Sequence, residues 1–403
     1  MKDTASQLAC LYKDLIPLLE QQEYDPERSN SLFKGPWGAL LFMFYYEQYA
    51  DHTADNAAAL LEKIYASYKP EDGLNYSFCS GHTGPFWLLD HLNRHQFVEM
   101  DMDYLASDFI TATIVQSAYH IECKNFDFLH GSIGMCNFLL GFTARADVKA
   151  HLEHFVTTLF AVSRMTDKGR SLPIFYTHEI PAGEYVDAFS LAHGSCSALI
   201  LLSKIYQAGI ATSACKQLIT ESIPFILQHK IERPPDSLHA LYPAILDGKY
   251  ASTDSRLSWC YGDLNVALAL WNCGKVLSEK SWMDEALLIM HHNIARSSDE
   301  AAGIVDNCIC HGAAGIAAFY RKFWFETKDP AFYTCAEHWH NKALEKISFS
   351  EDGSKHGIKV WQGKDKQWDY SWDLLDGGSG VGLSILSHLQ DHPLPWDECF
   401  LMS

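Results

Sequence analysis

The sequence has no apolar run of about 18 residues, the length needed to cross a membrane. Residues 1–30 also lack the basic start and the uninterrupted apolar stretch of a secretory signal. These two absences argue against a membrane-spanning or secreted protein. We therefore expect a protein that is made and kept in the cytoplasm, with no transmembrane segment.

Basic residues and closely spaced cysteines are also scarce. The 31 Lys and Arg residues face 50 Asp and Glu residues, and the formal charge of −19 opposes the phosphate neutralisation on which nucleic-acid affinity depends. We therefore expect no nucleic-acid partner. The 12 cysteines are scattered over 403 residues, unlike those of small disulfide-rich scaffolds, so most should be reduced and buried and a few can be ligands.

A short glycine-centred pattern recurs along the chain, each time followed by an apolar run. The first glycines of its copies are Gly35, Gly81, Gly131, Gly194, Gly262, Gly312 and Gly377. Successive copies lie 46 to 68 residues apart, and no low-complexity linker or composition break separates them. The chain is therefore expected to form a single domain over 1–403.

Each copy indicates the start of a helix, where glycine allows a sharp turn and close helix packing. The apolar runs have no polar face, which is typical of helices buried on all sides. The segments between them carry one apolar stripe and are expected to form outer helices, for example near 57–68, 150–163, 282–295 and 331–347. This alternation predicts an all-α fold, an α/α toroid (barrel) of seven inner and seven outer helices. An open solenoid is the alternative, but its last repeat should have a polar face, whereas the copy at Gly377 is as apolar as the others.

Two intervals between copies are long and rich in Pro, Gly and Asp, near 165–190 and 228–257. Proline breaks helices, so these intervals are expected to be long loop insertions. Both directly precede a glycine motif. We therefore expect them to lie over the same end of the ring.

The residue before the first glycine is polar in every copy. The series is Lys34, Ser80, His130, His193, Tyr261, His311 and Asp376. If all inner helices start at one mouth of the ring, these side chains form a polar rim above an apolar barrel, where a functional site is expected.

One position further back, Cys260 and Cys310 come from copies that are neighbours in a ring and stand beside His311. Two thiolates and one imidazole suit Zn²⁺, with a fourth position left open, as in catalytic zinc sites. A Cys-His pair alone is commonly a buried thiol beside a hydrogen-bonded histidine, and it is the repeat alignment with Cys260 that favours a metal. Cys79 shares this register but belongs to a distant copy and is interpreted as a core cysteine. Cys308 is an alternative ligand in a different register.

The motifs SWCYG (258–262), CHG (310–312) and AHG (192–194), with the repeated glycine-led helices, resemble the lanthionine synthetase C-like (lanthipeptide cyclase) family over the whole chain. The resemblance implies a seven-hairpin toroid with one zinc ion held by Cys260, Cys310 and His311. It also implies catalytic roles for four residues that match the family's positions: His193, Asp127, Arg256 and Tyr261.

Each of these positions also has a structural interpretation. Asp127 lies a few residues before an inner helix and can be its N-cap. Arg256 can be a loop residue paired with Asp254 or Asp263. His130 has no family counterpart that can be placed, and we interpret it as structural.

The implied reaction is intramolecular addition of a Cys thiol to dehydroalanine or dehydrobutyrine, which closes a (methyl)lanthionine thioether ring. The open zinc position would hold the substrate thiol as a thiolate. His193 would donate the proton to Cα, Asp127 would orient His193, and Arg256 or Tyr261 would stabilise the enolate. The implied partners are a dehydrated precursor peptide with leader and core, a separate dehydratase and an exporter.

Three alternatives remain open at this point. A member of the same family can add glutathione or another thiol to dehydrated residues in proteins. Other toroid enzymes include prenyltransferase subunits, whose Asp-Cys-His zinc set differs from this one, and glycosidases, whose carboxylate pair is not obvious here. The third alternative is a peptide-binding helical scaffold without catalysis.

Overall fold

The computed structural model describes residues 4–23, 25, 28–69, 75–172, 186–246, 251–363 and 365–403. This part of the chain forms sixteen α-helices and two short β-hairpins. It divides into two compact units: residues 1–75, 79–101 and 304–403 form the first, and residues 76–78 and 102–303 form the second. Most of the predicted loop near 165–190 (173–185) and part of the one near 228–257 (247–250) lie outside the described residues.

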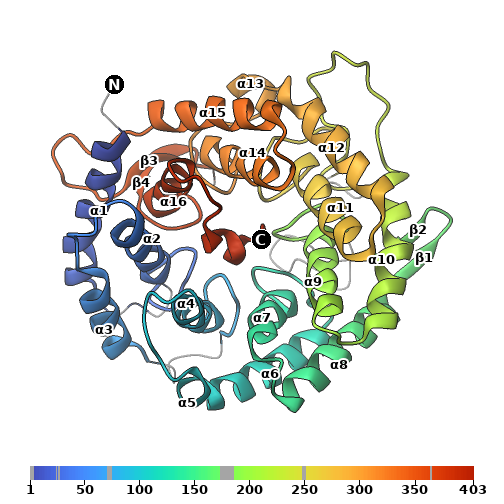
Figure 1. Cartoon of the computed structure of the whole chain (residues 1–403), viewed down its shortest axis with the longest axis horizontal. Helices are drawn as coiled ribbons and strands as arrows, with labels where there is room; N and C mark the ends of the chain where they lie inside the picture. The colour runs from blue at the N-terminus through green and yellow to red at the C-terminus, as the bar shows by residue number, and fades with distance from the viewer. Residues whose placement is uncertain are drawn as a thin grey trace. The chain divides into compact units, whose positions relative to one another are not determined.

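The first unit contains four of the helices that follow the glycine motifs. These inner helices are α2 (Pro36–Tyr49), α4 (Thr83–Arg94), α14 (Ala313–Thr327) and α16 (Gly378–His388). The outer helices are α1 (Thr4–Gln21), α3 (Ala57–Ser67) and α15 (Pro330–Glu345). Within this unit α16 packs against both α14 and α2, so the last copy of the pattern meets the first (Figure 1). That contact is expected of a closed ring and not of an open solenoid.

The second unit contains the other three inner helices. They are α7 (Ser132–Leu139), α9 (Ser195–Gln207) and α11 (Asp263–Leu277), and α9 packs between the other two (Figure 1). The outer helices are α6 (Ser107–Glu122), α8 (Ala146–Val162), α10 (Thr212–Leu227) and α12 (Lys280–Ile294). Three short helices complete the unit: α5 (Met102–Leu105), η1 (Leu140–Phe142) and α13 (Asp299–Ala302).

All four outer-helix segments quoted from the sequence are helical, and an inner helix follows every glycine motif. The inner helices are buried as predicted. In α2 every residue from Pro36 to Tyr46 is buried, including Trp37, Phe42 and Tyr45 at 0% exposure. Full burial of a large apolar side chain contributes about 1.5–3 kcal/mol each, so these helices supply much of the core.

The motif glycines are required by close packing. A Cβ on Gly194 would lie 2.2 Å from the carbonyl oxygen of Ala188. Gly262 has φ +95°, a backbone conformation that side chains other than glycine rarely adopt. Substitution at either position therefore requires the loop before the helix to move.

Two antiparallel hairpins were not expected from the sequence. Strand β1 (Arg164–Thr166) pairs with β2 (Gly169–Ser171), and β3 (Ile358–Gln362) pairs with β4 (Gln367–Ser371). Each strand is three to five residues long, which leaves too little alternation to distinguish from a loop. The β3–β4 hairpin precedes the last glycine motif, and the Trp361 N–H donates to Asp306 Oδ2 (3.0 Å). This bond ties the hairpin to the loop before α14.

In the described part of the chain, every helix is either too short or too polar to cross a membrane.

Candidate functional site

A hydrogen bond that closes the loop before the inner helix recurs from copy to copy. In six copies, the side chain four residues before the motif glycine accepts the backbone N–H of the rim residue three positions later. The acceptors are Ser31, Asp127, Ser190, Ser258, Cys308 and Asp373. Asp127 therefore has a structural role in this loop. It accepts the N–H of His130 (2.7 Å), which precedes the helix, and the N-cap residue of α7 is Gly131. The interpretation of Asp127 as a helix N-cap is wrong for this reason.

Asp127 has a second contact that the other acceptors in this register do not share. Its Oδ2 lies 2.6 Å from Nδ1 of His193, across 66 residues of sequence. The Asp127 side chain is 1% exposed and that of His193 is 13% exposed. The carboxylate is thus buried behind the ring, and Nε2 of His193 is the nitrogen directed away from it. Because a carboxylate accepts hydrogen bonds, this contact places a proton on Nδ1 and fixes the orientation of the ring.

Two aromatic neighbours flank His193. The His130 ring stacks on it at 6.0 Å between centroids, and the Tyr261 ring lies at 6.2 Å. The three rings come from rim positions of consecutive copies, as the repeat alignment predicted. His130 therefore lies next to the predicted acid–base residue, a contact that sequence reasoning missed. The sequence did indicate this contact, because His130 and His193 both stand directly before the motif glycine in neighbouring copies.

Cys260 is held beside His193 by its neighbours in the second unit. The Ser190 hydroxyl accepts the His193 N–H (2.8 Å) and donates to the carbonyl oxygen of Cys260. The Cys260 thiol is half-buried and lies 3.5 Å from Ser258 Oγ. Cys260, Tyr261 and Arg256 all line one cavity of about 550 Å³. The second unit therefore brings one predicted ligand and two predicted catalytic residues to the same cavity.

Arg256 is exposed, and among the described residues it has no carboxylate partner. Asp254 pairs instead with His239 (2.6 Å). Asp263 is fully buried and accepts the backbone N–H groups of Leu241 and Tyr242 (2.9 Å each). Burial raises the pKa of Asp263, and these hydrogen bonds oppose the shift. The structural interpretation of Arg256 as a partner of Asp254 or Asp263 is therefore wrong.

Cys310 and His311 lie in the first unit, on the loop before α14, and both are half-buried. The Cys310 N–H donates to the carbonyl oxygen of Leu375 (3.1 Å), and the His311 N–H donates to Cys308 Sγ (3.3 Å). Cys308 is fully buried, and burial, followed by the charges of Asp306 and Asp376, raises the pKa of its thiol well above the ordinary value. Cys308 is therefore engaged in closing the loop, whereas Cys310 is the more exposed of the two thiols.

Two other rim residues of the first unit, Lys34 and Asp376, pair with each other. Lys34 forms ion pairs with Asp376 and with Asp373 (3.5 Å). Burial lowers the pKa of Lys34, but the charges of the two aspartates outweigh it and raise the pKa above its ordinary value. Cys79 is buried at 5% exposure, in agreement with its interpretation as a core cysteine.

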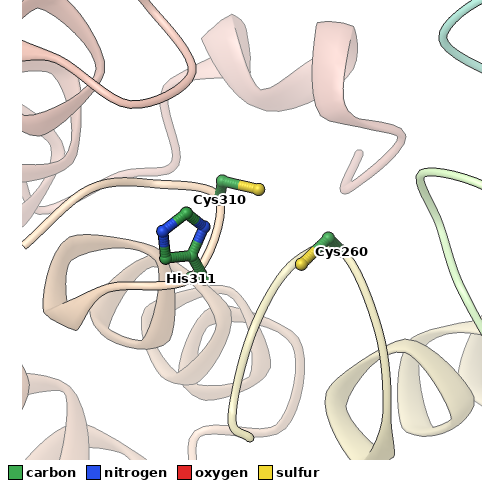
Figure 2. A group of neighbouring side chains, drawn as sticks. All are labelled: Cys260, Cys310 and His311. Carbon is green, nitrogen blue, oxygen red and sulfur yellow. The ribbon is translucent and has the colours of Figure 1, made fainter. Parts of the chain in front are cut away.

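Figure 2 shows the three predicted metal ligands: Cys310 and His311 follow each other on one loop, and Cys260 stands on the loop before α11. In the described part of the chain, some cysteine, histidine and carboxylate side chains lie close enough together to bind a metal ion. Cys260, Cys310 and His311 each belong to such a group. The donor set of two thiolates and one imidazole fits Zn²⁺. Because Cys260 belongs to the second unit and the other two to the first, their binding of one ion stays a proposal.

Comparison with known proteins agrees with the resemblance seen in the sequence. The sequence model of the family described as lanthionine synthetase C-like protein matches residues 26–401. The chain therefore belongs to the lanthionine synthetase C-like family. No curated protein sequence matches the chain.

Among solved structures, nisin cyclase matches with a TM-score of 0.70 at 18% sequence identity, over 98% of this chain and 97% of that chain. A cellobiose 2-epimerase from Bacillus thermoamylovorans matches with a TM-score of 0.39 at 9% identity, over 95% of this chain and 100% of that chain. The likeness to nisin cyclase shows the fold, and the prediction of an all-α toroid is confirmed. The prediction of a single domain over 1–403 stays a prediction.

Proposed function

We propose that this protein is a zinc-dependent lanthipeptide cyclase that closes (methyl)lanthionine rings in a dehydrated precursor peptide. The observation that carries the proposal is the cavity of about 550 Å³ that Cys260, Tyr261 and Arg256 line together. His193, hydrogen-bonded to Asp127, lies beside Tyr261. Membership of the lanthionine synthetase C-like family supports the same function.

We propose Cys260, Cys310 and His311 as the ligands of one zinc ion. Two thiolates and an imidazole leave one tetrahedral position open, which distinguishes catalytic from structural zinc sites. When bound, zinc would hold the substrate cysteine as a nucleophilic thiolate near neutral pH.

The other residues then act on the dehydrated side chain. Addition of the thiolate forms the S–Cβ bond and moves the Cα=Cβ electron pair toward the carbonyl group, and the enolate needs a proton at Cα. The Nδ1 proton of His193 is held by Asp127, so a proton on Nε2 is the one available for transfer. Arg256 and Tyr261 line the cavity, and we propose that they stabilise the enolate oxygen or position the peptide.

The precursor peptide is flexible, and the surface of this acidic chain offers no excess of basic residues for an acidic leader. We therefore propose that leader binding depends on backbone and apolar contacts. A separate dehydratase would supply the dehydrated residues, and an exporter would remove the product. Both would act with this protein in the cytoplasm.

The test combines a metal readout with a reaction readout. Purified wild type, Cys310→Ser and Cys308→Ser are loaded with Co²⁺, whose sulfur charge-transfer absorbance reports thiolate ligation, and are then incubated with a dehydrated cysteine-containing peptide. We expect the absorbance and the loss of peptide thiol in wild type and Cys308→Ser, and neither in Cys310→Ser. His193→Asn should keep the absorbance and lose cyclisation by about 10²–10⁴-fold, the usual contribution of a general acid.

Three results would contradict the proposal. Thiolate ligation that survives in Cys310→Ser would remove the ligand assignment. An unchanged rate in His193→Asn would remove the acid assignment. Addition of glutathione to the peptide without ring closure would assign the protein to the thiol-adding alternative within the same family.

A further inference from the structure

A second group of side chains with metal-ligand chemistry lies within the first unit. His91 lies in the last turn of α4, His95 is the C-cap residue four positions later, and Glu398 reaches them from the C-terminal helix η3 (Pro395–Phe400). Their ligand atoms all lie within 4.8 Å of one another. His91 Nδ1 is 3.1 Å from Glu398 Oε2, and His95 Nε2 is 3.2 Å from Glu398 Oε1. The group shares no residue with the proposed catalytic zinc site.

We propose that His91, His95 and Glu398 bind a divalent transition-metal ion, with Zn²⁺ as the expected occupant, that clamps η3 onto α4. The two histidines are four positions apart at the end of the helix, which is the spacing of helical zinc-binding pairs, and their ring centroids lie 4.4 Å apart. Zinc bonds of about 2.0–2.1 Å in tetrahedral geometry put ligand atoms about 3.3 Å apart. Each histidine nitrogen lies near this distance from one oxygen of Glu398, His91 Nδ1 from Oε2 and His95 Nε2 from Oε1.

The hydrogen bonding of His91 suits a metal ligand. The ring is buried, and its second nitrogen, Nε2, lies 2.9 Å from the Tyr45 hydroxyl. With a metal on Nδ1, the Nε2–H donates to the oxygen of Tyr45, which is the outer hydrogen bond that orients most metal-binding histidines.

A cavity leads to Glu398, and Arg94 is a competing partner of its carboxylate. Glu398 lines a cavity of about 400 Å³, which gives an ion a route to the carboxylate. Arg94 Nη2 lies 3.0 Å from Glu398 Oε2, and Arg94 Nε lies 2.7 Å from Asp90. The guanidinium and a metal ion would compete for the same carboxylate. Removal of Arg94 should therefore strengthen metal binding, an effect opposite in sign to removal of a ligand.

The test uses the full chain in the Cys310→Ser background, so that the proposed thiolate site does not contribute. Zn²⁺ is titrated by calorimetry into metal-stripped protein with His95→Gln, with Arg94→Gln, or with the exposed control substitution His52→Gln. We expect one saturable site in the background protein and in the control. His95→Gln should weaken binding at least about tenfold, the lower end of the effect of losing even an outer partner. Arg94→Gln should tighten it.

Two further readouts keep the proposal testable if a variant is unstable. Zinc should raise the thermal unfolding midpoint of the background protein but not that of its His95→Gln variant. X-ray absorption of the zinc-loaded background protein should show nitrogen and oxygen ligands without sulfur. The absence of saturable binding, equal affinity with and without His95, or a sulfur ligand would overturn the proposal, and each of these results is independent of the cyclase assignment.

Discussion

Asp127→Asn replaces one carboxylate oxygen of the buried Asp127–His193 pair with an amide NH₂ at nearly constant volume. The remaining oxygen can still accept the His130 N–H (2.7 Å), so the loop should keep its conformation. The new NH₂ group faces His193 Nδ1, which lies 2.6 Å from the carboxylate in the native protein. Because an amide NH₂ donates, Nδ1 must become an acceptor and the ring proton moves to Nε2. The ring can then no longer carry protons on both nitrogens at this position, which the proposed acid step requires.

The size of the effect follows from the lost hydrogen bond. A hydrogen bond to a charged group contributes about 1.5–3 kcal/mol, and each ~1.4 kcal/mol corresponds to a tenfold change in rate. The wrong tautomer of a catalytic histidine has cost about 10⁴-fold in a serine protease. We therefore expect the cyclisation rate of Asp127→Asn to fall by about 10²-fold or more, with thiolate-bound metal unchanged.

The assay measures the initial rate of thiol loss from a dehydrated cysteine-containing peptide. Asp373→Asn is the matched control, because Asp373 occupies the same register in the last copy and accepts the Asp376 N–H (2.8 Å). It lies beside Lys34 and has no histidine partner among the described residues. A wild-type rate in Asp127→Asn, or an equal loss in Asp373→Asn, would refute the reasoning. Nitrogen NMR of histidine-labelled protein checks the tautomer directly.

Three further predictions concern stability. Gly194→Ala should destabilise the fold by roughly 1–3 kcal/mol, because the added Cβ would lie 2.2 Å from the carbonyl oxygen of Ala188; urea unfolding against Gly363→Ala, where the space is open and the backbone is not left-handed, measures it. Ser190→Ala removes the acceptor of the His193 N–H and should cost about 1–3 kcal/mol in the same assay, and a loss below a few tenths would contradict the assigned bond. Burial lowers the pKa of His151 to about 4, so its contribution to stability is complete above pH 6.5 and is lost as the pH falls toward 4. His151→Gln should reduce the slope of unfolding free energy against pH in this window by up to about 1.4 kcal/mol per pH unit, and an unchanged slope would show that His151 does not titrate there.

The inner helices could be predicted because their signals are local. A glycine followed by a run without polar residues specifies a helix start and complete burial within a few turns, as in α2 after Gly35. The metal-ligand types at Cys260, Cys310 and His311 were also visible, because the repeat aligns the two cysteines to one register and His311 directly follows the second. Family resemblance then suggested His193 and Asp127, which no spacing rule connects.

The hairpins and several side-chain partners could not be predicted. Strands β3 and β4 are too short for a period of two to stand out from a loop. The structural interpretation of Arg256 failed because Asp254 and Asp263, although close in sequence, are both used by other groups. His91 and Glu398 are 307 residues apart, and no feature of the helix around His91 indicates which C-terminal residue it meets.

By itself the sequence determined the class of fold, the number of repeated units and the polar residue types directly before the motif glycines. These features are local, because apolar periodicity and the conformational freedom of glycine affect only a few neighbouring residues. Only the tertiary structure decided which groups meet: Asp127 Oδ2 with His193 Nδ1, the Ser190 hydroxyl with the Cys260 carbonyl, and Arg256 with the cavity. These contacts join different copies of the repeat. They depend on how neighbouring loops pack, and that packing is set by long-range burial, which a local pattern does not encode.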